Sequence, residues 1–419
     1  MIKKFLMVML CVLVSTSMLF AGGQEEEKAL DATVDENWPD MTWEQVLAEA
    51  DGQTVNFYMW GGGTSYNNFV DNVLGEAAEE YGVTINRVGV TNITEAVNTV
   101  IGEKAAGKVD GGTVDIFWIN GSNFMMMQQA GVTFPEWSEA IPNAKHVNWD
   151  NPSIKFDMGY PVNGQESPWM TAQFQLIYNS DLYSKDELPK NYTEFMAFAK
   201  ANPGVVTYPG IPDFHGTRFI KAAMYELTGG FEQYNRDDIT KEEFEEMTEP
   251  VWEYFEELEP YLWKEGKTYP SSTQQLELYN NGESVFSVTM NGMGIYNDIQ
   301  NGKYPEASKV YCLDTSIADT NYVALTFNGA HKAGAMVIAN IIADPFIQAK
   351  NISSTGGAPA IDSTTLTDEQ TEAFAKELAK LAPGTYVEAS EKARTTAPEI
   401  SSYLNIYIEE IWNERIGSN

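Results

Sequence analysis

The feature that most constrains the fold is an apolar, strand-like run that ends in a polar loop at residues 113–124, TVDIFWINGSNF. The apolar part holds Val114, Ile116, Phe117, Trp118 and Ile119. Such runs are typical of strands covered on both faces of a parallel sheet. The polar part consists of Asn120, Gly121, Ser122 and Asn123. Open α/β sheets bind ligands at the carboxyl ends of their strands, so this loop is a candidate site. The alternative is an ordinary turn in which Ser122 or Asn123 caps a following helix.

The residues before this strand alternate between two patterns. Residues 54–60 and 83–88 have the pattern of strands, whereas 65–81 and 95–106 place apolar residues at helical spacing. Together with the strand at 113–119, this order predicts an α/β protein with parallel strands and right-handed crossovers. Because 419 residues exceed the usual size of one hydrophobic core, we expect two lobes.

The charge of the chain argues against two classes of partner. The sequence has 26 basic and 60 acidic residues, a formal net charge of -34. A field of that sign repels phosphate backbones and anionic lipid headgroups, so we expect neither nucleic acid nor a membrane surface as a partner. Overall charge does not define the charge of a pocket, although it mildly favours a cationic ligand.

The first residues indicate the compartment. Residues 1–21 have the basic start, apolar run and small-residue end of an export signal, and the acidic residues 22–40 resemble a flexible tether. We therefore expect a periplasmic protein. A lipid anchor is disfavoured because Cys11 comes too early for a full apolar region. Cys312 is the only cysteine after the signal, which leaves no partner for an intramolecular disulfide.

Patterns for catalysis and for metal binding are missing from the sequence. His146, His215 and His331 stand far apart, and the sequence contains no HExxH, CxxC or GxSxG motif. The glycines at 61–63 lack the Lys-Ser or Lys-Thr of a nucleotide loop. They could form an ordinary tight turn, or could present backbone donors to an anionic or carbonyl group at a helix start. We therefore predict no metal, no cofactor and no enzymatic activity.

Several loops share aromatic and amide side chains at strand ends or chain crossings. The candidate ligand-binding residues are Trp60, Gly62, Gly63, Tyr66, Asn120, Ser122, Asn123, Trp169, Gln173, Asn291 and Tyr296. Taken singly, each aromatic residue is more often part of a core. In a two-lobed protein, loops of one character would face a single cleft, which favours a small-molecule site.

Four stretches carry a resemblance to a known family. The segments WINGSNF, SPWMTAQFQLIYN, NNGESVFSVTMNG and NYVALTFNGAHKAGAMVIANIIADPFIQAKN resemble those of the substrate-binding proteins of ABC importers. The last segment is the most specific; Tyr322, Lys332, Ala333, Met336 and the pair Asp344-Pro345 match its layout. Residues 118–124 and 168–174 are most similar to uncharacterised members grouped with thiamine, polyamine and iron importers.

The resemblance implies a two-lobed periplasmic-binding-protein type II fold, in which each lobe is a mostly parallel sheet flanked by helices and the ligand cleft lies between them. Lobe one would hold residues 41–165 and 284–322, and lobe two would hold 170–280 and 327–419. The chain would cross between the lobes near 169–174, near 281 and near Tyr322, which adds Tyr322 to the candidate site.

The resemblance also implies a function. The chain would be a monomeric receptor that captures a small organic solute and delivers it to a membrane permease with its ATPase. Trp60, Tyr66 and Trp169 would stack on a thiamine-like or other cationic or heteroaromatic compound. Iron is disfavoured because that branch generally uses paired tyrosines and no Tyr-Tyr pair occurs.

Two alternatives remain open. A carbohydrate receptor of the same family would also use Trp, Asn and Gln. A secreted glycoside hydrolase would need two carboxylates, for instance among Asp115, Asp157 and Glu166.

Overall fold

The computed structural model describes residues 41–119, 121–236, 238–387 and 395–417. The expected signal, the expected tether and Asn120 lie outside these residues. Within the described residues, no helix is both long enough and apolar enough to cross a bilayer.

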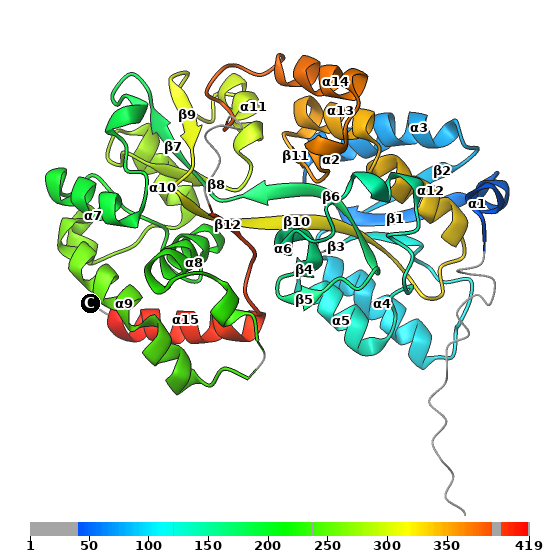
Figure 1. Cartoon of the computed structure of the whole chain (residues 1–419), viewed down its shortest axis with the longest axis horizontal. Coiled ribbons are helices and arrows are strands. Elements are labelled where there is room, and N and C mark those ends of the chain that lie inside the picture. Colours follow the sequence, from blue (N-terminus) through cyan, green and yellow to red (C-terminus); the bar gives the residue numbers. More distant parts are fainter. Residues whose placement is uncertain (1–40, 120, 237, 388–394, 418–419) are drawn as a thin grey trace, which may run out of the picture. The chain divides into compact units, whose positions relative to one another are not determined.

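The largest sheet runs through the middle of the described chain in the order β11-β6-β10-β3-β1-β2, and β12 also pairs with β10 (Figure 1). Its strands are β1 (Thr54–Trp60), β2 (Thr84–Val90), β3 (Ile116–Ile119), β6 (Glu166–Gln173), β10 (Thr315–Leu325), β11 (Ala358–Pro359) and β12 (Thr395–Ala397). The first three strands pair in parallel, as their alternation with helices predicted. β10 pairs antiparallel with both β3 and β6, and β11 pairs antiparallel with β6. β12 pairs in parallel with β10.

A second sheet has three strands in the order β8-β7-β9. Its strands are β7 (Gln175–Asn179), β8 (Ser287–Thr289) and β9 (Ser308–Tyr311). Both pairs are antiparallel, which differs from the mostly parallel sheet expected in each lobe. A small hairpin pairs β4 (Phe156–Asp157) with β5 (Tyr160–Pro161).

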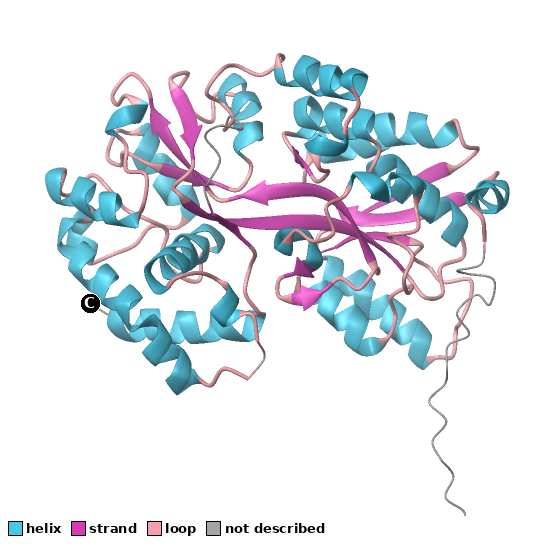
Figure 2. Cartoon of the chain, in the orientation of Figure 1, coloured by secondary structure: helices cyan, strands magenta, loops and turns pink. Residues whose placement is uncertain are grey.

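Helices flank both sheets (Figure 2). Those in the first part of the chain are α1 (Trp43–Ala50), α2 (Thr64–Asn68), α3 (Gly75–Glu79), α4 (Ile93–Ala105), α5 (Ser122–Ala130) and α6 (Pro152–Lys155). Those in the middle are α7 (Tyr192–Ala201), α8 (Phe214–Thr228), α9 (Lys241–Leu258), α10 (Ser272–Asn280) and α11 (Ile295–Gln300). The last are α12 (Lys332–Ile342), α13 (Pro345–Thr355), α14 (Asp368–Leu378) and α15 (Ser402–Arg415).

Two large hydrophobic clusters form the cores of the two lobes. The first core includes Val46, Phe57, Trp137, Val323 and Ile338. The second core includes Phe174, Tyr208, Phe219, Trp252 and Leu404. The chain passes from the first to the second between β6 and β7. β10 belongs to both, because Ile317 lies in the second core whereas Val323 and Leu325 lie in the first.

The cores divide the chain differently from the predicted division. β8 and β9 pair with β7, so residues 287–311 lie with the second core rather than with lobe one. α12 contributes Ala333 to Ile342 to the first core rather than to lobe two. The predicted crossing near 281 is also wrong, because α10 and β8 stay on the same side: Gln275 of α10 donates to the carbonyl of Phe286 at 3.1 Å. The apolar pattern of a strand does not indicate which of two sheets the strand joins, because every sheet edge offers the same backbone N–H and C=O groups.

A buried ion cluster ties α8 to β10. Arg218 Nη2 lies 2.5 Å from Asp319 Oδ2 and 3.0 Å from Glu399 Oε1. Lys221 pairs with the other oxygen of Glu399 and donates to Asn405 Oδ1 at 3.2 Å. The four charged side chains are at most 9% exposed. Two positive and two negative charges are thus enclosed together, so losing one would leave a buried charge without compensation.

We predict that Arg218→Met lowers the free energy of unfolding by about 3–5 kcal/mol, because Asp319 would keep its buried charge without its partner. Urea denaturation followed by circular dichroism measures this change. Arg236→Met is the matched control. Arg236 also pairs with two carboxylates, Asp238 and Glu243, but its side chain is 40% exposed. Exposed pairs contribute up to about 1 kcal/mol, so equal losses in the two variants would contradict the prediction.

Candidate functional site

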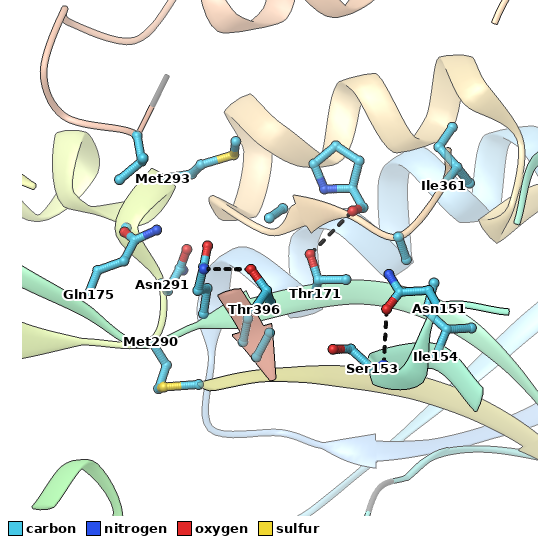
Figure 3. Close-up of a pocket in the computed structure, with 18 of the residues that line it drawn as sticks. Asn151, Ser153, Ile154, Thr171, Gln175, Met290, Asn291, Met293, Ile361 and Thr396 are labelled. Carbon is cyan, nitrogen blue, oxygen red and sulfur yellow. Dashed lines mark hydrogen bonds between the residues drawn. The ribbon is translucent and has the colours of Figure 1, made fainter. Parts of the chain in front are cut away.

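A cavity of about 380 Å³ lies between the two cores (Figure 3). Its lining comes from the end of β6 and the start of β7, the loop at 290–293, residues 356–363 after α13, residues 148–154 around α6, and Thr396 of β12. Elements that pack in both cores therefore contribute to one concave surface. Its volume falls in the range of small-molecule sites.

Hydrogen bonds hold several of the lining groups in place, as Figure 3 shows. Thr171 of β6 donates its hydroxyl to the carbonyl of Pro359 at 3.2 Å. Gln173 Nε2 donates to Thr396 Oγ1 at 3.4 Å. These bonds position polar groups from β6, β11 and β12 around the cavity.

Two loops that contribute to the cavity lining contact each other. Asn291 caps the short helix Gly292–Gly294 by accepting the Gly294 N–H at 3.1 Å, and its Nδ2 lies 3.4 Å from the carbonyl oxygen of Thr355. Gly356 has a φ of 77°, and a Cβ added there would lie 2.5 Å from Gly294 Cα. Glycine is thus needed where the end of α13 meets the loop after β8.

Two of the residues predicted from sequence, Gln173 and Asn291, line this cavity. Trp60 lies elsewhere and is 47% exposed. Its indole ring covers the backbone of the adjacent glycines: a Cβ on Gly62 would collide with the ring, and one on Gly63 would lie 3.0 Å from it. The ring of Trp60 therefore packs on the backbone of Gly62 and Gly63 and stays exposed.

Three other predicted aromatic residues are packed against protein atoms. The ring of Tyr66 lies 5.2 Å from that of Trp118, and Trp118 lies 4.7 Å from Trp169. Trp169 is 1% exposed and belongs to the first core. Tyr322 is fully buried and donates to the carbonyls of Ser153 and Ile154. Trp169 and Tyr322 are thus core residues here, because the β6–β10 ladder turns them inward.

The remaining predicted residues are dispersed. Asn123 Oδ1 accepts from the Thr94 hydroxyl at 2.8 Å, and Ser122 is exposed at the start of α5. Tyr296 is half-buried on α11. Asn120 is outside the described residues. Ser122 and Asn123 do not cap α5 with their side chains; Gly121 precedes the helix at a φ of 60°.

Sequence reasoning missed the segments 148–154 and 356–363, which form much of the cavity lining. A usable signal existed in the second segment, where Gly356-Gly357 and Pro359 interrupt the chain directly after a helical pattern. The first segment carried no comparable signal, since Ser153 and Asn151 look like ordinary loop residues.

Asp157 and Glu166 are two buried carboxyl groups, and Asp157 contacts the residue that precedes α5. Asp157 Oδ2 accepts the Gly121 N–H at 2.6 Å, and burial raises the pKa of Asp157 to about 8. Glu166 is fully buried, and neither of its oxygens has a hydrogen-bond partner in the described part of the chain. Burial, with a smaller effect of the Asp157 charge, raises the pKa of Glu166 well above its usual value. Asp157 and Glu166 therefore bind protons more tightly than ordinary carboxyl groups do.

The other polar side chains singled out in the sequence have structural partners. Asp115 accepts the backbone N–H groups of Asn56 and His331, and its Oδ2 lies 3.1 Å from His331 Nδ1. His146 Nδ1 lies 3.0 Å from the Thr365 hydroxyl. Among the described residues, no group of three or more His, Cys, Asp or Glu side chains could hold a metal ion.

We predict that Glu166→Gln stabilises the protein more at pH 8 than at pH 5. A carboxyl group whose folded pKa is raised binds its proton more tightly in the folded state, so its contribution is lost as pH rises above about 4. Gln cannot ionise and escapes that loss, which should raise the free energy of unfolding by about 1–3 kcal/mol at pH 8. Melting temperatures across the pH range measure the effect. Glu306→Gln, at an exposed position, should leave the profile unchanged, and a pH-independent shift in Glu166→Gln would contradict the explanation.

The fold has counterparts among solved structures. An ABC transporter protein from Clostridium perfringens matches with a TM-score of 0.61 at 15% identity, covering 86% of this chain and 99% of that one. The spermidine/putrescine substrate-binding protein PotD of Streptococcus pneumoniae matches with a TM-score of 0.58 at 14% identity, covering 88% and 100%. The solute receptor AcbH, described as exclusive for β-D-galactopyranose, matches with a TM-score of 0.61 at 12% identity, covering 88% and 96%. These neighbours confirm the expected α/β, two-lobed periplasmic-binding-protein type II fold.

Sequence comparison gives the family. Protein YnjB of Escherichia coli (strain K12) is 34% identical over 338 residues, which are 79% of this chain and 86% of that protein. The family model described as "Bacterial extracellular solute-binding protein" matches residues 73–379. With the two-core fold and the cavity between the cores, these matches show that the chain belongs to the bacterial extracellular solute-binding proteins.

Proposed function

We propose that this chain is the periplasmic receptor of an ABC importer, which captures a small organic solute in the cavity between its cores and delivers it to a membrane permease. The observation that carries the proposal is the cavity of about 380 Å³, to which elements of both cores contribute. The family and the transport proteins of similar fold support this role.

The geometry suggests how capture would be coupled to delivery. A solute in the cavity would contact β6 and residues 356–363 on one side and the loop at 290–293 on the other. Because it would contact both walls only when they are close, binding would favour the closed arrangement. A permease that recognises the closed arrangement would then receive loaded receptors.

Two classes of solute are candidates, and each has an observation in its favour. The exposed indole ring of Trp60, seated over Gly62 and Gly63, favours stacking on a flat or cationic compound such as a thiamine-like solute. The carboxamide and hydroxyl groups that line the cavity favour a carbohydrate. The carboxylates Asp115, Asp157 and Glu166 are buried outside the cavity lining, so nothing in their placement favours a hydrolase.

We predict that Ala172→Phe abolishes solute binding. Ala172 of β6 lines the cavity, and a phenyl ring there would occupy space that the solute needs. The measurement is isothermal titration with the compound that most raises the melting temperature in a panel of sugars, polyols, polyamines, vitamins and amino acids. Ala106→Phe, at an exposed position outside the cavity, is the control and should bind normally.

A parallel Trp60→Ala variant separates the two candidate surfaces. If Trp60→Ala abolishes binding and Ala172→Phe does not, the solute binds at the exposed indole ring and the cavity proposal is wrong. If no compound in the panel binds, the receptor function loses its support.

A further inference from the structure

We infer that the solute is a hydroxyl-bearing molecule and that the Gln175 carboxamide is its main recognition group. This inference rests on the proposed function, because it assigns a substrate class to the same cavity. It depends on two polar side chains of the lining whose hydrogen bonds are incomplete.

The first is Gln175, which begins β7 and lines the cavity. The residue is 9% exposed, and its Oε1 has no hydrogen-bond partner in the described part of the protein. A buried polar group without a partner costs free energy, typically about 1–3 kcal/mol, so such groups are expected to be satisfied by something. Oε1 is itself enclosed beside Gly292, so a solute in the cavity would supply the missing partner once the carboxamide turns toward it.

The second is Ser153 of α6, in a different wall. It is 5% exposed, lines the cavity, and its hydroxyl also has no partner among the described residues. In the view of Figure 3 the two side chains lie on opposite sides of the lining, with Thr396 between them. A solute with several hydroxyl groups could reach both.

The absence of a side chain at Gly292 determines where the Gln175 carboxamide can lie. A Cβ added to Gly292 would collide with the Gln175 carboxamide oxygen. The backbone φ of Gly292 does not require glycine, since its φ is not positive. The absent side chain instead provides the space in which the carboxamide lies beside the cavity.

The chemistry of these groups selects the solute class. A carboxamide offers a donor and an acceptor side by side, and a hydroxyl offers both on one atom. The lining adds further groups of the same kind, Asn148, Asn151, Thr171, Gln173, Asn291, Ser363 and Thr396. It also holds one carboxylate, Asp362, which accepts hydrogen bonds from hydroxyl groups. Ligand hydroxyl groups match this mixture because each can donate and accept. A polyol or a sugar would therefore satisfy the lining best.

The test compares hydroxylated solutes with matched compounds that lack hydroxyl groups. Monosaccharides, disaccharides and polyols should raise the melting temperature of the full chain, whereas polyamines and amino acids without a side-chain hydroxyl should not. Gln175→Met keeps the length of the side chain and removes both polar atoms. We expect it to weaken binding of the best hydroxylated compound at least about tenfold, by titration calorimetry.

Gly292→Ala keeps the Gln175 side chain but displaces its carboxamide. This variant should therefore also bind the best hydroxylated compound more weakly. Gln300→Met repeats the substitution at an exposed position of α11 outside the lining and should bind normally. Melting temperatures of the unliganded variants distinguish lost recognition from lost folding.

Two results would overturn the inference while the receptor function stands. One is tight binding of a thiamine-like, cationic or acidic compound in preference to every sugar and polyol. The other is an unchanged dissociation constant in a folded Gln175→Met variant. Failure of every compound to bind would instead remove the proposed function itself, and this inference with it.

Discussion

The structure depends on the antiparallel ladder between β6 and β10. These strands pair from Glu166 to Gln173, and β10 is buried along almost its whole length. One end of β10 packs in the first core and the other in the second, so the ladder is shared by both lobes. Residues at the Gln173 end of the ladder line the cavity, and Asp319 at the same end enters the buried ion cluster. The same backbone hydrogen bonds thus join the lobes, position the cavity and hold the charges that anchor α8.

Close packing around glycine shapes both candidate ligand surfaces. At the cavity, Gly294 and Gly356 allow two loops from different parts of the chain to meet, and Gly292 makes room for the carboxamide of Gln175. At the outer surface, Gly62 and Gly63 lie under the indole ring of Trp60. In each case the missing Cβ is the functional property, because any side chain would collide with a neighbouring group. Such glycines position other residues, and Gly292 and Gly356 also line the cavity.

Buried polar groups in this protein fall into two kinds. The ion cluster of Arg218, Lys221, Asp319 and Glu399 is internally compensated, so it explains stability without invoking a ligand. The carboxamide oxygen of Gln175 and the hydroxyl of Ser153 have no hydrogen-bond partner among the described residues, and both residues line the cavity. A bound solute would compensate these two groups. Glu166 also lacks partners but lies away from the cavity lining, and protonation is the compensation open to it.

The sequence by itself determined the local elements and the fold class. The run at 113–119 predicted β3, and the alternation before it predicted the parallel pairing of β1, β2 and β3. Such elements follow from periodicity and capping, which are properties of neighbouring residues. Only the tertiary structure decided that β8 and β9 join β7, that Trp169 is core, and that Gln173 and Asn291 share a cavity with residues 356–363. The physical reason is that sheet membership and burial depend on contacts between distant segments, which periodicity does not record.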